Sequence, residues 1–245
     1  MMPADAHHGI SLAAVRLADV DLGQEHMLDG AELARADTFR SRGLRERFVA
    51  GRIALRLHIS ALTGDNPASL KADYFCPSCR NRNGKGHGLP RYQLPSKTTI
   101  GSLHVSLSRS GTWCLLAASL NEGIAGIGVD IETGSSADFV GFEELAMSAN
   151  ERSQLQRVPV ALRNAFQTRL WCRKEAVLKA LGTGLATAPS LLDVSGSAPA
   201  VPGSPSGSKL WKLEDISPAS VGLPEGFAAT LAVRQRDEAA PDSGP

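Results

Sequence analysis

The chain has 245 residues, 42% of them hydrophobic, and a formal net charge of +1 at pH 7. This apolar content suffices for one large core or two smaller ones, whereas the near-neutral charge argues against a dedicated nucleic-acid binder, whose domain would be markedly basic. No N-terminal segment resembles a signal peptide and no apolar run approaches the roughly 20 residues of a membrane span, so we expect a cytoplasmic protein that does not bind membranes.

An arginine-rich helix is the first prominent element that the sequence predicts. Between residues 35 and 56, seven arginines are interrupted by only two acidic residues, Asp37 and Glu46. Such a run is typical of a solvated helix face or of a nucleic-acid patch, and the residues alone leave both readings open.

The motif Cys76-Pro77-Ser78-Cys79, with His87 eight residues later, has the spacing of half a zinc knuckle. A closed structural zinc site needs four ligands. The other two cysteines, Cys114 and Cys172, stand alone. We therefore expect a simple loop or a labile disulfide here rather than a zinc site.

Two strands are predicted next, over Leu103–Ser108 and Trp113–Ser119, because both segments are rich in apolar residues and the turn residues Ser110-Gly111 separate them. Together with the arginine-rich helix they form an N-terminal half that we assign to residues 1–120.

The stretch Gly126-Ile127-Gly128-Val129-Asp130-Ile131-Glu132 predicts a strand after a turn at Asn121-Glu122-Gly123. Side chains alternate along a strand, so Asp130 and Glu132 point to the same side. Two adjacent carboxylates repel each other unless a cation or a proton lies between them. Two acids that simply face water at a strand end are the alternative.

A long helix is predicted over residues 161–181, because apolar residues recur there near the helical period and Gly182 provides a C-terminal stop. On this helix Trp171, Glu175 and Lys179 are successive i, i+4 neighbours and share one face. A surface Glu–Lys pair is the alternative interpretation.

The remaining segments complete a C-terminal half at residues 121–235. Ser148-x-x-Glu151 predicts a capping box that opens a helix. Late strands are expected near Lys209–Glu214 and Phe227–Val233, and Ser195–Ser208 is expected to be a mobile loop because it is rich in Gly, Ser and Pro. The tail, residues 236–245, is expected to be disordered.

Taken together, four blocks of the sequence resemble the 4′-phosphopantetheinyl transferases, in their longer, Sfp-type branch. In chain order, the first block is the arginine-rich helix from Arg47 to Arg56, and the second is the strand with Ser108-Arg109-Ser110-Gly111. The third block is Asp130-Ile131-Glu132. The fourth is Trp171-Cys172-Arg173-Lys174-Glu175-Ala176-Val177-Leu178-Lys179-Ala180, continued by Gly182-Thr183-Gly184-Leu185. They occur in the order found in that family and cover roughly residues 35 to 190.

This resemblance implies an α+β fold of two similar halves related by a pseudo-twofold axis. Each half would be a small sheet packed on a long helix, with the cofactor site between the halves. It also implies a magnesium-dependent holo-[acyl-carrier-protein] synthase, for which manganese is a possible substitute. Such an enzyme transfers the phosphopantetheine arm of coenzyme A to a serine of acyl or peptidyl carrier proteins of polyketide, nonribosomal peptide or fatty acid synthases, and releases adenosine 3′,5′-bisphosphate.

The resemblance also assigns roles to individual residues. Asp130, Glu132 and Glu175 match the metal-binding positions, and Glu175 and Lys179 are the expected catalytic residues. Glu175 would accept the serine proton either directly or through a metal-bound water, and the sequence leaves both routes open. Arg47, Arg52, Ser108, Arg109 and Lys174 are the expected contacts of coenzyme A. The region around Phe139, Phe142, Leu145 and Met147 lies where carrier proteins dock in the family, although packing into the core is an equally good reading of each of these residues.

Two positions depart from the family pattern. Arg109 stands where the family has a histidine, and we expect it to keep the phosphate-binding role because arginine also binds phosphate. Leu89 replaces the lysine of a Gly-Lys-Pro element, a contact that Lys85, His87 or Arg91 could supply instead.

Two other functions are compatible with the same residues. A different divalent-metal phosphotransferase or nucleotide hydrolase could use the three carboxylates. A protein that binds carriers or coenzyme A without turnover is suggested by the departures at Arg109 and Leu89. Longer family members act as single chains, so we expect a monomer, which light scattering can test.

Overall fold

The computed structural model describes residues 9–75, 89–95, 103–134, 137–204 and 209–237. The strands are β1 (Ser11–Arg16), β2 (Lys71–Phe75), β3 (Leu89–Gln93), β4 (His104–Ser110), β5 (Trp113–Ser119), β6 (Ile124–Glu132), β7 (Trp211–Asp215) and β8 (Ala228–Gln235). The α-helices are α1 (Gly30–Ala36), α2 (Arg42–Thr63), α3 (Phe142–Ala146), α4 (Ala149–Leu155), α5 (Val160–Leu181) and α6 (Pro218–Val221). Short 3-10 helices are η1 (Leu17–Asp19), η2 (Leu22–Met27), η3 (Pro67–Ser69), η4 (Gly184–Ala186) and η5 (Pro189–Leu191).

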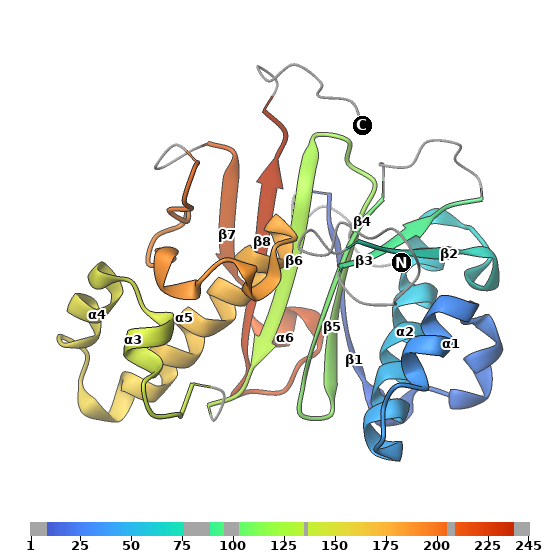
Figure 1. The fold of residues 1–245 in the computed structure, drawn as a ribbon, viewed down its shortest axis with the longest axis horizontal. Coiled ribbons are helices and arrows are strands. Elements are labelled where there is room, and N and C mark those ends of the chain that lie inside the picture. Colours follow the sequence, from blue (N-terminus) through green and yellow to red (C-terminus); the bar gives the residue numbers. More distant parts are fainter. Residues whose placement is uncertain (1–8, 76–88, 96–102, 135–136, 205–208, 238–245) are drawn as a thin grey trace.

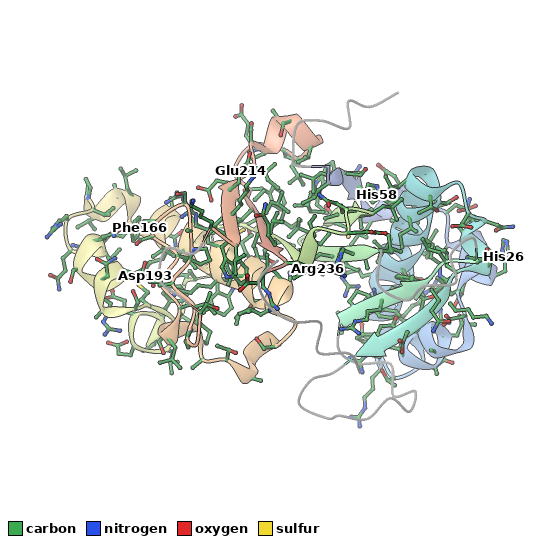
Figure 2. The ribbon with its side chains drawn as sticks, turned by 90° about the horizontal axis from the view of Figure 1, so that it is seen from above. His26, His58, Phe166, Asp193, Glu214 and Arg236 are labelled. Atoms are coloured by element: carbon green, nitrogen blue, oxygen red, sulfur yellow. The ribbon has the colours of Figure 1, made fainter. Side chains whose placement is uncertain are left out.

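The strands form antiparallel sheets, which makes the fold α+β as predicted. One sheet has the order β1-β5-β4, a second has the order β6-β8-β7, and β2 pairs with β3. Figure 1 shows the two three-stranded sheets side by side in the middle of the molecule, with α5 on one flank and α2 on the other. Seen from above, Phe166 and Asp193 lie toward the α5 end and His26 and His58 toward the α2 end (Figure 2).

Strand β5 is buried on both faces, which explains its nearly continuous apolar sequence. Leu116 and Ala118 belong to a core cluster with residues of α2, whereas Leu115 and Ala117 belong to a cluster with residues of β6 and β8. Alternate side chains of one strand therefore join the two halves of the chain. The three strands β1, β5 and β4 all lie before residue 121, and β6, β8 and β7 all lie after residue 120. The core cluster of β5, β6 and β8 nevertheless contains residues from both sides of this boundary.

Strand β6 lies directly on the backbone of α5. A Cβ atom added to Gly126 would overlap the carbonyl oxygen of Ala180, and one added to Gly128 would overlap the carbonyl oxygen of Ala176. The opposite face of β6 presents Ile127, Val129 and Ile131 to the second core cluster. Glycine on one face thus permits the close approach that places β6 carboxylates beside α5.

Several predicted boundaries agree with the structure. Helix α5 begins one residue before the predicted 161–181 and ends at Leu181, followed by the cap residue Gly182, whose φ is 78°. The capping box of Ser148 and Glu151 is present. The segment 195–204 is irregular, but it is held in place, because Asp193 and Ala200 form a β-bridge and Val201 is buried. The expected loop is thus present over 195–204, and its mobility stays a prediction.

Other predictions fall outside the described residues. These are the Cys76–Cys79 loop with Lys85 and His87, residues 205–208, and the tail from 238 onward. Within the described part of the chain, no helix is both long enough and apolar enough to cross a membrane.

Replacing Gly128 by alanine should lower the free energy of unfolding by about 1–3 kcal/mol or more, because the new methyl group would meet the helix backbone and push β6 from α5. The matched control is Gly30→Ala, where an added Cβ meets nothing within 4 Å. Urea denaturation of both variants measures the effect. Equal midpoints for Gly128→Ala and Gly30→Ala would contradict the close-packing argument.

Candidate active site

A cavity of about 570 Å³ lies at the junction of the two sheets and combines acidic and basic side chains. It is lined by Arg52, Pro90, Ser106, Leu107, Ser108, Arg109, Asp130, Glu132, Glu175, Lys179, Gly182, Thr183 and Gly184. The lining residues come from α2, β3, β4, β6, α5 and the start of η4. Residues from both halves of the chain therefore meet in this one cavity.

Asp130 is the most constrained carboxylate in this cavity, with a side chain only 3% exposed. Its Oδ1 accepts hydrogen bonds from Ser108 Oγ and from Lys179 Nζ, each at 2.6 Å. Its Oδ2 is buried and has no hydrogen-bond partner. A buried carboxylate oxygen without a partner is costly, so this oxygen is suited to a cation.

Glu132 and Glu175 line the same cavity from β6 and α5. Burial raises the pKa of Glu175 above its ordinary value; Lys179 opposes this shift, and the charges of Asp130 and Glu132 add to it. The three carboxylates thus repel one another, and a divalent cation would relieve that repulsion. Their oxygens are also the ligands that Mg²⁺ prefers.

Within the described residues, no three His, Cys, Asp or Glu side chains are already grouped closely enough to hold a metal ion. Lys179 supplies the positive charge beside Asp130 instead, and it also donates to the carbonyl oxygen of Val129 at 3.1 Å. The donor set and the unpartnered Oδ2 of Asp130 fit a hard divalent cation, with Asp130, Glu132 and Glu175 as the residues that would hold it.

Two arginines form the basic side of the cavity. The Arg52 guanidinium lies between the rings of Phe48 and Tyr74, at 5.1 and 5.3 Å from the ring centroids. Its Nε and Nη1 are buried without a hydrogen-bond partner. Arg109 passes over Gly51, and burial together with the charge of Arg52 lowers the pKa of Arg109. Neighbouring guanidiniums with unused donors favour an anion such as phosphate.

Arg47 lies beside this pair but not in the cavity lining. It is exposed on α2, and its carbonyl oxygen accepts a 3.3 Å hydrogen bond from Arg109 Nη1. Its expected contact with coenzyme A stays a prediction.

Ser108, expected to contact coenzyme A, lines the cavity, and its hydroxyl donates to Asp130 rather than pointing free into the space. Ser106, Pro90 and Thr183 also line the cavity, although no role was predicted for them. Ser106 could have been predicted from its spacing, because Ser106, Ser108 and Ser110 alternate along the strand and side chains two residues apart share one face.

The structure contradicts the expected role of Lys174. Its side chain is fully buried, its Nζ forms a 2.8 Å ion pair with Glu151, and it donates to the carbonyl oxygens of Pro189 and Leu192. An ammonium group has three donors, and all are used inside the protein. Lys174 therefore points away from the cavity, whose lining does not include it. The prediction that it contacts phosphate is wrong.

The predicted docking region divides into buried and exposed side chains. Phe142 and Met147 are buried in the core, with the Phe142 ring 6.1 Å from that of Trp171. Phe139 is 47% exposed and Leu145 is 64% exposed. Core packing is therefore the correct reading for the first two residues, whereas the other two remain available to a partner.

The buried thiols take no part in this chemistry. Cys172 contacts the carbonyl oxygen of Asp130 at 3.2 Å, and burial followed by the charge of Asp130 raises its pKa well above the ordinary value. Burial raises the pKa of Cys114 to about 11. Both side chains stay protonated and inert near neutral pH.

Residues 126–220 match the model of the 4′-phosphopantetheinyl transferase superfamily. Over this region, the chain is similar to members of that superfamily. The matched transferase region contains Asp130, Glu132, Glu175 and Lys179, whereas Arg52 and Arg109 lie before it.

Individual proteins extend the likeness. The chain is 30% identical over 160 residues to the 4′-phosphopantetheinyl transferase HetI of Nostoc sp., a match that covers 65% of this chain and 61% of HetI. A holo-(acyl-carrier-protein) synthase from Bacillus anthracis, solved with CoA (3′,5′-ADP), is 23% identical with a TM-score of 0.37 and covers 46% of this chain and 98% of that one. The Thermotoga maritima holo-[acyl-carrier-protein] synthase is 21% identical with a TM-score of 0.35, covering 46% and 65%.

Replacing Lys174 by methionine should lower the free energy of unfolding by about 3–5 kcal/mol, because it leaves the Glu151 carboxylate buried without its cation. The double variant Lys174→Met, Glu151→Gln removes both charges and should recover part of the loss. Urea denaturation measures stability, and calorimetry measures coenzyme A affinity. A stable Lys174→Met protein with weakened coenzyme A binding would restore the original assignment.

Proposed function

We propose that this protein transfers the 4′-phosphopantetheine arm of coenzyme A to a serine hydroxyl of a carrier protein and releases adenosine 3′,5′-bisphosphate. The observation that carries the proposal is the composition of the central cavity. Three carboxylates from β6 and α5 and two arginines from α2 and β4 line the same space. A metal-bound pyrophosphate with a further phosphate nearby requires this combination of charges.

The acidic side of the cavity accounts for the chemistry of the transfer. Asp130, Glu132 and Glu175 would hold Mg²⁺, which neutralises and orients the pyrophosphate oxygens when bound. The serine oxygen forms a bond to the β-phosphorus as the bond from that phosphorus to the oxygen of the leaving adenosine bisphosphate breaks. Glu175, which lines the same cavity, accepts the serine proton.

The basic side of the cavity accounts for binding. Arg52 offers buried donors that no protein group uses, and Arg109 lies beside it in the position where the family has a histidine. These two side chains bind the phosphates of the adenosine bisphosphate moiety. Lys179 neutralises charge at the reacting pyrophosphate, because its ammonium group is bonded to Asp130 and both side chains line the cavity.

Carrier recognition is assigned to the apolar side chains next to α3. Phe139, Val140 and Leu145 are exposed there, and Leu191 of η5 is 63% exposed. The Phe142 ring makes edge-to-face contacts with the rings of Phe139 and Trp171, and Trp171 precedes Glu175 by one helical turn. A carrier helix bound at these side chains would therefore lie on the side of α5 that leads to the cavity.

Several finer assignments belong to the same proposal. We assign the chain to the Sfp-type branch and take magnesium as its metal. Carrier domains of polyketide, nonribosomal peptide or fatty acid synthases are the proposed substrates, and a cytoplasmic monomer is the proposed active form. The match to HetI and the joint use of both halves in one cavity support the branch assignment.

Intact-mass spectrometry of apo carrier proteins incubated with coenzyme A and magnesium tests the function. A gain of one phosphopantetheine mass, lost when a chelator is added, is the expected result. Glu175→Gln should reduce the rate by at least about 100-fold, because general acid–base groups contribute roughly that much or more. Coenzyme A binding without transfer to any acyl or peptidyl carrier would favour an inactive binding protein. No coenzyme A binding at all would favour another metal-dependent phosphotransferase.

Replacing Arg109 by methionine should weaken coenzyme A binding by about 10- to 100-fold, the equivalent of one hydrogen bond between charged groups. Arg109→His should lose less, because histidine also donates to phosphate. The matched control is Arg42→Met on the exposed surface of α2, where the side chain is 92% exposed. Isothermal titration calorimetry measures all three. Equal affinities for Arg109→Met and Arg42→Met would remove Arg109 from the binding site.

A further inference from the structure

Three serines of β4 contact β6 where the two three-stranded sheets meet. Ser106, Ser108 and Ser110 are two residues apart and share one face of the strand. The sheet orders place β4 at the edge of one sheet and β6 at the edge of the other. Serine hydroxyls of β4 form hydrogen bonds across this junction, where the described sheets have no backbone ladder between β4 and β6.

Each serine reaches a different group of β6. Ser106 Oγ accepts from the backbone N–H of Val129 at 3.0 Å. Ser108 Oγ donates to Asp130 Oδ1 at 2.6 Å. Ser110 Oγ lies 3.4 Å from Glu132 Oε2, a longer contact. The first fixes the β6 backbone and the other two touch the carboxylates.

The contact to Asp130 determines which of its oxygens is available. Ser108 and Lys179 both occupy Oδ1, and the carboxylate is buried, so its plane cannot turn without losing both bonds. Oδ2 is left without a partner. Groups that hold a metal ligand in one orientation in this way change metal affinity by about 10- to 100-fold when they are removed.

We propose that Ser108, with a weaker contribution from Ser110, is a positioning residue that aims the β6 carboxylates at the divalent cation. This rests on the proposed function for the identity of the ligand, a hard divalent cation, but not on transfer itself. It replaces the expectation that Ser108 binds coenzyme A, because its hydroxyl proton is already donated to Asp130.

The test uses Mn²⁺ as the probe, bound to the full chain and followed by electron paramagnetic resonance without coenzyme A or carrier. Ser108→Ala should weaken Mn²⁺ binding at least about 10-fold, and Ser110→Ala should weaken it less because its contact is longer. Ser108→Thr keeps the hydroxyl and should recover most of the affinity. The matched control is Ser119→Ala, which also removes a buried serine hydroxyl, in this case one that donates to the carbonyl oxygen of Gly9.

Steady-state kinetics on carriers modified by the wild type separates positioning from substrate binding. Ser108→Ala should regain most of its kcat as Mn²⁺ is raised, with an unchanged KM for coenzyme A at saturating metal. A raised KM for coenzyme A with unchanged Mn²⁺ affinity would return Ser108 to cofactor binding and overturn the proposal. Mn²⁺ affinities that match those of Ser119→Ala, or a wild type that binds no Mn²⁺, would also overturn it. Metal binding that depends on Ser108 in a protein without transfer activity would support the proposal while refuting the proposed function.

Discussion

The close approach of β6 to α5 is the constraint on which the rest of the site depends. Gly126 and Gly128 lie against the backbone of α5 at Ala180 and Ala176, where no Cβ fits. This contact brings Asp130 on the strand within hydrogen-bonding distance of Lys179 on the helix. With a bulkier residue at either glycine the strand would move outward by the width of a side chain, and the carboxylates would no longer share a cavity with Glu175 and Lys179.

The second constraint is the junction between the two sheets. Strand β5 joins their cores through side chains on both of its faces, while β4 and β6 face each other through serine hydroxyls. A continuous backbone ladder would bring these strands to within about 5 Å of each other. The hydroxyl contacts instead bring acidic residues from one half next to basic residues from the other, so a highly charged ligand can be neutralised at two places at once.

Charge is distributed unevenly across this cavity for a physical reason. Burial and mutual repulsion raise the pKa of Glu175, and burial with the charge of Arg52 lowers the pKa of Arg109. Like charges are thus gathered at a cost to the unliganded protein. A cation on the acidic side and an anion on the basic side would relieve that cost, which is the usual arrangement of a preorganised site. By contrast Lys174 is neutralised inside the protein by Glu151 and contributes to folding instead.

Local patterns in the sequence were sufficient for the elements and for most of the site. The spacing of apolar residues and Gly182 predicted α5, alternation on a strand placed Asp130 and Glu132 on one side, and the family resemblance joined them to Glu175. The sequence could not predict which way Lys174 points. Adjacent helical residues lie about 100° apart around the axis, so Lys174 and Glu175 point in different directions. The partner of Lys174 is Glu151, 23 positions earlier in the chain, and only the folded structure brings the two together.

The same limit explains the roles of Ser108 and Phe142. Whether a hydroxyl binds a ligand or a neighbouring carboxylate, and whether a ring lies in the core or at the surface, depends on the residues that other segments bring beside it. The sequence by itself determined the strands, the helices and the kinds of charge available for catalysis, since these follow from contacts between residues close together in the chain. Only the tertiary structure decided which of those charged groups share a cavity and which are paired inside the protein, because ion pairing and burial depend on long-range packing.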